Sequence, residues 1–359
     1  MGTVQSEARN GEGVDLRSDN VAPVAPEILA AIEAANRGPA ASYGADAYSE
    51  RLQQIFRALF ETDLVVFPVL TGTAANALAI AQLAPPYGAA FCHEHAHLDS
   101  DECGAPEFFS GGAKLVLVGG AHGRIDPAAL VRALEALDAH DDHQVKPSAL
   151  SLSQATECGT VYGLDEIRRL TAVAREANLR VHMDGARIAN AVQRLGCSPA
   201  EATWRAGIDV LSFGATKNGA LAAEAVVVFD RALADELGRR RKRAGHLLSK
   251  MRYVSAQLEA YVADGLWLRL AERANRAAAK LAEGLRGIDG VTLAHPVEAN
   301  EIFVHLPPAL AAGLEKAGIA FHPWPGARDL YRLVASYCTG DAAVERVLEC
   351  AAHLARETR

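Results

Sequence analysis

Three short segments of the chain carry residues whose types and spacing could do chemistry together. The first is LTGTAAN at residues 70–76, a turn that opens directly into a helix. Backbone N–H groups at a helix N-terminus bind a phosphate well, and the small Gly72 and Thr73 permit its close approach. The segment lacks the spacings of a dinucleotide-binding loop and of a P-loop. It is either a phosphate site of another kind or an ordinary strand-to-helix turn.

The second segment is VHMDGAR at residues 181–187, where an apolar strand ends in Asp184 and Arg187 follows. The carboxyl ends of parallel strands are where such sheets place ligand chemistry. An acid there could keep a heteroaromatic nitrogen protonated by direct ion pairing. The alternative is a surface salt bridge between Asp184 and Arg187 within a turn.

The third segment, FGATKNG at residues 213–219, places Lys217 and its neighbour Thr216 just past another apolar strand. A lysine at the mouth of a sheet forms a Schiff base when its neighbours lower its pKa, although most lysines at strand ends are merely solvated. Lys217 follows Asp184 by 33 residues. This order of phosphate turn, strand-end acid and strand-end lysine is the arrangement of pyridoxal 5′-phosphate (PLP) enzymes of the aspartate-aminotransferase type. There the acid contacts the pyridine nitrogen and the lysine binds the cofactor aldehyde.

More narrowly, the chain resembles the low-specificity L-threonine aldolases of the β-eliminating lyase group. The resemblance runs through nearly the whole chain in family order. The matching segments are DLRSDN (15–20), SYGAD (42–46), TGTAAN (71–76), HLDSDECGAP (97–106), HMDGARIANA (182–191), SFGATKNG (212–219) and YRLVASY (331–337). It implies a PLP-dependent aldolase that cleaves L-threonine, L-allo-threonine or a bulkier phenylserine to glycine and an aldehyde. Another PLP lyase reaction, β-elimination, is the alternative within the fold.

The resemblance also implies roles for individual residues. His97 matches the histidine that stacks over the cofactor ring, and His143 matches a second active-site histidine. Arg332 matches the arginine that binds the substrate carboxylate, with Ser18 and Arg187 nearby. The general base is then His97, His143 or a water ordered by both. The residues expected to hold the cofactor are Gly72, Thr73, His97, Asp184, Arg187, Thr216 and Lys217.

A cluster of alternating histidines supports a rival class. His93, His95 and His97 would share one face of an extended segment, a layout common among metal ligands, so a metallohydrolase is the alternative. Further ligands are not evident, because His122 and His143 lie in loops without recognisable ligand spacing. We therefore expect no metal in the site.

Predicted strands and helices position these segments. Short β-branched runs in the sequence alternate with helical patterns. They predict an α/β fold: a large domain with a seven-stranded, mainly parallel sheet between helices, plus a smaller C-terminal α+β domain. The strands are expected at 64–67, 89–92, 114–118, 149–153, 180–183, 210–214 and 225–229, with helices at 127–137 and 164–177. The smaller domain has expected strands at 291–293, 301–306 and 331–335 and helices at 308–317 and 341–354. We expect a flexible tail over 1–12, the PLP-binding domain over 13–245, and a linker helix with the small domain over 246–359.

Charge and composition limit the partners. The net charge of −8 argues against nucleic acid or an anionic membrane surface as the main partner. No unbroken apolar stretch is long enough to span a membrane, and the first dozen residues lack a secretory h-region. We expect a cytoplasmic protein with reduced cysteines. The resemblance implies a homodimer or homotetramer with the active site at the subunit interface. The basic segment 239–252, which includes Lys250 and Arg252, either reaches a neighbouring phosphate or is a solvated helical face.

Overall fold

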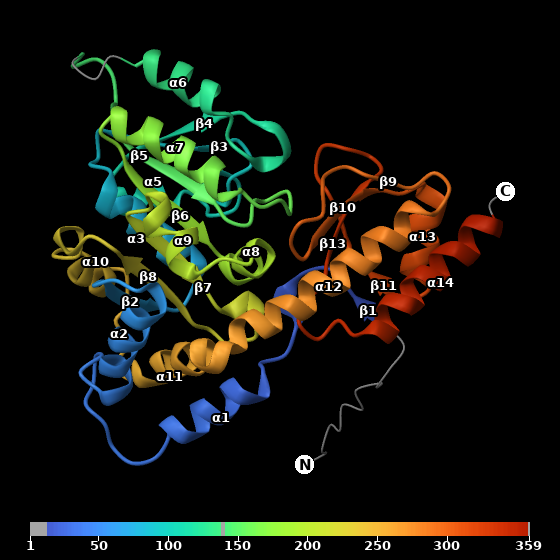
Figure 1. The fold of residues 1–359 in the computed structure, drawn as a ribbon, viewed down its shortest axis with the longest axis horizontal. Helices are drawn as coiled ribbons and strands as arrows, with labels where there is room; N and C mark the ends of the chain where they lie inside the picture. The colour runs from blue at the N-terminus through green and yellow to red at the C-terminus, as the bar shows by residue number, and fades with distance from the viewer. Residues whose placement is uncertain (1–12, 138–140, 358–359) are drawn as a thin grey trace, which may run out of the picture.

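A seven-stranded sheet forms the centre of the larger part of the molecule (Figure 1). The computed structural model describes residues 13–137 and 141–357. The strand order is β2-β8-β7-β6-β5-β3-β4, and only β8 runs antiparallel to its neighbours within this sheet. The strands are β2 (Val65–Val69), β3 (Gly88–His93), β4 (Lys114–Val118), β5 (Lys146–Ser153), β6 (Arg180–Gly185), β7 (Val210–Gly214) and β8 (Glu224–Val228). The predicted mainly parallel sheet is confirmed.

Helices cover both faces of this sheet because alternate residues of each buried strand point to opposite sides. Leu211 and Phe213 of β7 pack in one core, and Val210 packs in the other. The α-helices are α1 (Pro26–Ala35), α2 (Ala47–Phe60), α3 (Gly72–Leu83), α4 (His97–Ser100), α5 (Ala105–Ser110), α6 (Pro127–Glu135), α7 (Leu164–Glu176), α8 (Ile188–Leu195), α9 (Pro199–Ala202), α10 (Leu237–Arg243), α11 (Arg252–Val262), α12 (Leu266–Arg286), α13 (Pro308–Lys316) and α14 (Asp341–Glu357). The helices expected from residues 127 and 164 are present as α6 and α7.

The smaller part of the molecule is built on a four-stranded antiparallel sheet of order β12-β13-β10-β9. Its strands are β9 (Thr292–Leu293), β10 (Glu301–His305), β12 (His322–Pro323) and β13 (Leu330–Val334). Helices α13 and α14 pack beside it (Figure 1). The small α+β unit is confirmed, although the two-residue β12 was too short to be seen as a pattern in the sequence.

Two segments tie the two parts together. β1 (Val14–Asp15) pairs in parallel with β11 (Ile319–Ala320), so Val14 and Leu16 lie in the smaller core although we grouped them with the large domain. A two-residue strand carries too little periodicity to reveal its partner. The long helix α12 begins in the larger core and ends in the smaller one. The two parts are thus fixed side by side, and the division at residue 245 stays a prediction.

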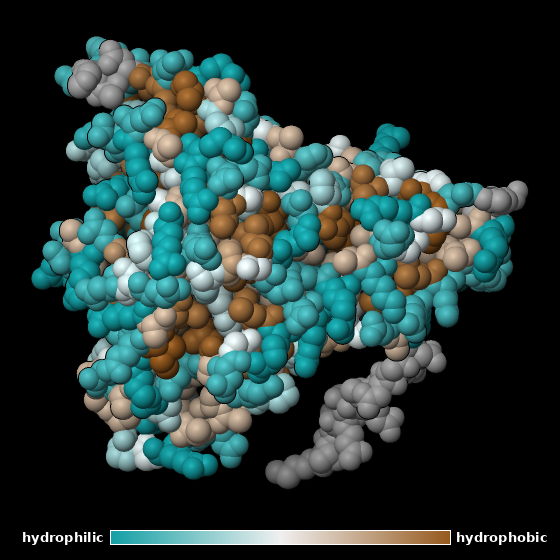
Figure 2. Space-filling view, in the orientation of Figure 1, coloured by the Kyte–Doolittle hydropathy of each residue, from teal (hydrophilic) through white to brown (hydrophobic). Residues whose placement is uncertain are grey.

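The surface is largely polar, and its apolar side chains lie in small, separate groups on the face shown in Figure 2. None of the described helices is both long and apolar enough to cross a membrane.

Candidate active site

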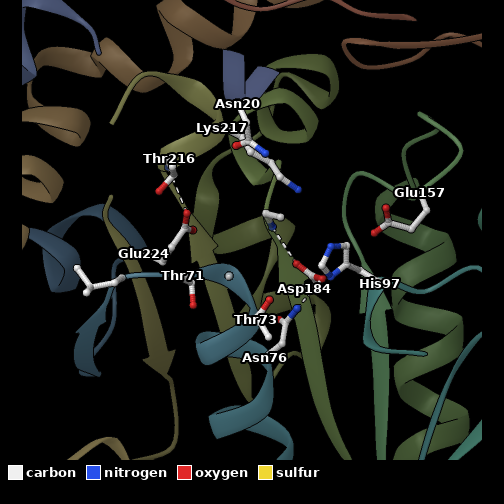
Figure 3. A pocket seen from close by; sticks show the side chains of 13 residues that line it. Asn20, Thr71, Thr73, Asn76, His97, Glu157, Asp184, Thr216, Lys217 and Glu224 are labelled. Carbon is white, nitrogen blue, oxygen red and sulfur yellow. Dashed lines mark hydrogen bonds between the residues drawn. The ribbon is translucent and has the colours of Figure 1, made fainter. Parts of the chain in front are cut away.

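Two adjoining cavities lie where the larger and smaller parts meet. One, of about 290 Å³, lies between the N-terminus of α3 and the carboxyl ends of β6 and β7 (Figure 3). The other, of about 630 Å³, extends toward Trp324 and Arg332 of the smaller part. Four residues line both cavities: Asn20, His97, Glu157 and Lys217. The sheet therefore presents its ligand cavity at the strand ends, as the topology of parallel sheets requires.

One end of the 290 Å³ cavity suits an anion. Thr71 caps α3, and its hydroxyl accepts a hydrogen bond from the Ala74 N–H at 3.1 Å. The N–H groups of Gly72 and Thr73, in the first turn, have no partner within the helix, and the helix dipole adds positive potential there. A side chain at Gly72 would meet nothing within 4 Å, so the cavity has free space directly in front of this turn. The segment therefore has the donors and the free space that a phosphate needs, and its role as a phosphate site stays a prediction.

A buried acid faces the same end. The carboxylate of Glu224 on β8 accepts a hydrogen bond from the backbone N–H of Thr216 at 3.3 Å. Burial raises the pKa of Glu224 to about 7, against the opposing effects of Thr216 and the Lys217 charge. Near neutral pH, a large share of this carboxyl is therefore protonated and able to donate a hydrogen bond to an anion.

Asp184 lies at the opposite side of this cavity, at the end of β6, and only 4% of its surface is exposed. Its carboxylate accepts hydrogen bonds from the Asn76 side chain at 2.8 Å and from the Ala186 N–H at 3.0 Å. Among residues 13–137 and 141–357, no cationic side chain forms a salt bridge with Asp184. The proposed surface salt bridge with Arg187 is wrong, because Arg187 points to other acids. A buried carboxylate held this way suits a cationic ring nitrogen.

His97 belongs to the same hydrogen-bond chain. Its Nδ1 lies 2.9 Å from a Glu102 carboxylate oxygen, and that oxygen also accepts from Asn76 at 2.7 Å. The hydrogen bond with Glu102 raises the pKa of His97, while burial raises the pKa of Glu102. The imidazole is thus held in one orientation at the cavity wall beside Asp184 (Figure 3).

The alternating histidines do not form a ligand set. Both ring nitrogens of the buried His93 are engaged, Nε2 with the Gly120 carbonyl at 3.1 Å and Nδ1 with the His95 N–H at 3.0 Å. His97 uses Nδ1 for Glu102. Across the described ranges, no group of three or more histidine, cysteine or acidic side chains is placed to hold a metal. The metallohydrolase alternative has no support in this geometry, because turns and hydrogen bonds replace the extended face that it assumed.

The two arginines differ in how many donors they keep free. Arg187 is buried, and its guanidinium donates to Asp19 at 2.8 and 3.1 Å and pairs with Glu301 at 3.1 Å. Arg332 lies 3.8 Å from Glu301, and its Nε is buried with no protein partner. Both line the larger cavity together with Ser18. Arg332 is therefore the arginine with donors available for a substrate carboxylate.

His143 lies elsewhere in the chain. It is exposed on a turn, where its N–H donates to Asp141 at 2.9 Å, just before β5 begins. The eight residues of β5, at about 3.3 Å each, separate it from the strand end that faces the cavity. His143 does not line either cavity of its own chain. A catalytic role for His143 stays a prediction and requires a second subunit.

The sequence analysis gave no role to several polar residues of the cavities and the hydrogen-bond network, among them Asn20, Asn76, Glu102, Glu157 and Glu224. The sequence holds a sign that two of these residues are functional. Glu224 opens a strand whose other residues are all apolar, and Asn76 is a polar residue in a helix that is buried nearly all round. Buried polar residues of this kind are held by partners or serve a site.

Together, the anion-binding turn, the buried acid after β6 and the lysine after β7 define a PLP-dependent enzyme of the aspartate-aminotransferase type. The model of the family described as β-eliminating lyase matches residues 15–308. The chain belongs to this family and is a PLP-dependent lyase.

The most informative relatives are threonine aldolases. The low specificity L-threonine aldolase of Pseudomonas aeruginosa is 45% identical over 95% of this chain and 96% of its own. The enzyme of the same name from a Pseudomonas species is 44% identical over 94% of this chain and 96% of its own. The solved structure of Leishmania major threonine aldolase superimposes with a TM-score of 0.89, at 27% identity, over 95% of this chain and 99% of that one.

Proposed function

We propose that the protein cleaves L-threonine and related β-hydroxy-α-amino acids to glycine and an aldehyde. The observation that carries this proposal is the meeting of the two cavities at Lys217, with Asp184 in the smaller cavity and Arg332 in the larger one. When bound, PLP supplies an electron sink for the bond that breaks at the substrate Cα. The residues present fit this cofactor, because the free space at Gly72 suits its phosphate, Asp184 its ring nitrogen and Lys217 its aldehyde.

The protein's own residues divide the remaining tasks. Asp184 would keep the pyridine nitrogen of PLP protonated, and Asn76 holds the Asp184 carboxylate in place. His97, oriented by Glu102, would lie beside the cofactor ring. Lys217 is the residue that would bind the cofactor aldehyde. Each of these side chains is held in place by a hydrogen bond or by its position at a strand end. Groups held in place before the reaction lower its activation barrier.

Arg332 selects the reaction. Only the Cα bond that lies perpendicular to the cofactor ring can break with help from the ring, so the orientation of the substrate decides which bond that is. A guanidinium that binds the carboxylate in a bidentate pair fixes this orientation. Arg187 supports the clamp indirectly, because it shares the Glu301 carboxylate with Arg332 and holds it in place.

The proposal includes a cytoplasmic homodimer or homotetramer. Exposed apolar side chains support an interface near the N-terminal segment, since 46% of Val21, 51% of Leu29, 51% of Tyr43 and 58% of Leu221 face solvent in the single chain. Six free cysteines suit a reducing compartment. In such an assembly, His143 of a partner subunit is the candidate that would complete the site.

A product analysis tests the proposed reaction. The purified protein is loaded with PLP and incubated with L-threonine, L-allo-threonine and L-phenylserine, and glycine, aldehyde, ammonia and oxo acid are measured. Equal amounts of glycine and aldehyde are expected. Ammonia and oxo acid without glycine would instead indicate β-elimination and would overturn the aldolase assignment while leaving the cofactor assignment intact.

A further inference from the structure

Glu157 has a carboxylate with no role so far in binding the cofactor or the substrate. It lines both cavities and is one of only four side chains that do so among the described residues. Its carboxylate points into the cavity, on the side across from Glu224 and the α3 turn (Figure 3). The structure records no hydrogen bond or salt bridge between this carboxylate and any described side chain.

The turn that carries Glu157 is held rigidly. The Thr156 and Thr160 hydroxyls lie 2.8 Å apart, and the Thr160 hydroxyl donates to the His122 carbonyl at 2.7 Å. Gly159 follows with a φ of +72°, and a side chain there would lie 2.7 Å from the Glu301 carbonyl oxygen. The backbone on both sides of Glu157 is thus fixed, so its side chain starts from a defined place at the cavity wall.

The surroundings of Glu157 suit a group that gives and takes a proton. Burial raises its pKa, and the nearby Asp184 adds to this effect. The charges of Lys217, Arg187 and His97 act in the opposite direction. A carboxylic acid moved toward neutrality is better matched to proton transfer near pH 7 than an ordinary one.

We infer that Glu157 accepts the β-hydroxyl proton of the substrate during carbon–carbon bond cleavage. In this step the O–H bond breaks and its proton passes to a Glu157 carboxylate oxygen. The O–H electron pair forms the carbonyl bond of the aldehyde while the Cα–Cβ bond breaks. The Cα–Cβ electron pair stays with Cα until Cα takes up one proton, which balances the proton that the hydroxyl gave up. The inference rests on the proposed aldolase function.

Glu157 fits this task better than His97. The Nδ1 of His97 is tied through Glu102 and Asn76 to Asp184, the partner of the ring nitrogen. Because the hydrogen bond with Glu102 also raises the pKa of His97, the imidazole is more readily protonated and is then unable to accept a proton. Glu157 has no such link and borders the larger cavity, where Arg332 would bind the substrate. The proton acceptor and the ring partner are therefore separate side chains.

The test compares E157Q with wild type and with E176Q. Glu176 is an exposed carboxylate at the end of α7 that lines neither cavity, so E176Q removes the same charge without touching the site. Three quantities are measured: kcat/KM for L-threonine cleavage, exchange of a glycine α-proton in D2O by NMR, and binding of PLP to the apoprotein by absorbance titration. Glycine has no β-hydroxyl, so its α-proton exchange does not need the acceptor.

We expect E157Q to lower kcat/KM for cleavage by about 10²- to 10⁴-fold, the usual contribution of a general base. Glycine exchange and PLP affinity should stay within about threefold of wild type. E157D, which restores a carboxylate, should recover part of the cleavage, and E176Q should behave as wild type. The acid limb of the cleavage pH profile should disappear in E157Q.

Three results would overturn the inference while the aldolase function stands: cleavage by E157Q close to that of wild type, an equal loss of cleavage and glycine exchange, or a loss of PLP binding that E157D repeats. If wild-type protein releases no glycine from any β-hydroxy amino acid, the proposed function itself fails. The two failures are therefore distinguishable.

Discussion

Replacing Arg332 with alanine removes the group that is proposed to orient the substrate. Arg332 lies on β13, where it pairs opposite Phe303, and its guanidinium lies 5.4 Å from the Trp324 ring centroid. Its Nη1 is 3.8 Å from a Glu301 oxygen, too far for a strong hydrogen bond. Its Nη2 donates to the Arg17 carbonyl at 3.5 Å and its Nε has no protein partner, so the guanidinium has only long contacts within the chain and can turn its donors to a carboxylate.

The expected cost follows from the bonds that the substrate would lose. A hydrogen bond to a charged group contributes about 1.5–3 kcal/mol, and a bidentate pair makes two that are not fully additive, so we take about 2–4 kcal/mol. At about 1.36 kcal/mol per factor of ten, kcat/KM for threonine cleavage should fall by about 30- to 1000-fold. R332K keeps the charge but not the planar fork, so its loss should be smaller yet clear.

Acetaldehyde release, coupled to NADH oxidation by alcohol dehydrogenase, measures this loss. R17A is the matched control, because Arg17 carries the same charge, is 49% exposed and pairs with Asp15 at 2.6 Å. Both variants should bind PLP with the wild-type absorption spectrum, since neither side chain lines the 290 Å³ cavity. If kcat/KM for threonine cleavage by R332A lies within about threefold of that of R17A, the loss of one positive charge explains the effect, and Arg332 does not bind the substrate carboxylate.

Three further predictions concern the cofactor site and the core. D184N keeps the shape of the side chain but loses its charge, so kcat should fall by about 10²- to 10³-fold while the circular dichroism spectrum stays that of wild type. A fall in kcat of only a few-fold would refute the role of Asp184 in keeping the ring nitrogen protonated. Glu224 has a pKa raised to about 7, so its carboxyl is neutral below that pH and anionic above it. PLP affinity, titrated by absorbance, should therefore weaken as the pH rises through 7 in wild type, and E224Q should flatten this dependence; an unchanged slope would contradict the proposed phosphate contact. F213A should lower the free energy of unfolding, measured in urea, by about 3–5 kcal/mol, because Phe213 contacts the rings of Phe56 and Trp267 in the larger core. A loss below about 1 kcal/mol would mean that neighbouring side chains move into the space that Phe213 leaves.

The large sheet was predictable because each of its strands is a short apolar run between turn residues, and all seven were found within a few residues of their expected bounds. The observed strand bounds differ from the predicted ones where polar residues continue a strand. β5 begins at Lys146 rather than 149, because its first residues pair with β3 at the edge of the core. The pairing of β1 with β11 was not predictable, because residues more than 300 positions apart meet through two-residue strands.

The site was predictable where a residue follows a strand. Asp184 and Lys217 lie at adjacent strand ends, so topology alone brings them to one cavity. Residues on loops depend on tertiary contacts that no local pattern encodes. Glu157 reaches the cavity only because its turn is held against His122 and Glu301, and His143 stays outside because it precedes its strand instead of following it.

The covalent attachment of the cofactor tests the central claim most directly. The protein is loaded with PLP, reduced with borohydride, digested and mapped by mass spectrometry. We expect a yellow protein whose visible band disappears on reduction, with one pyridoxyl group, on Lys217. A label on another lysine, or a protein that takes up no PLP, would contradict it.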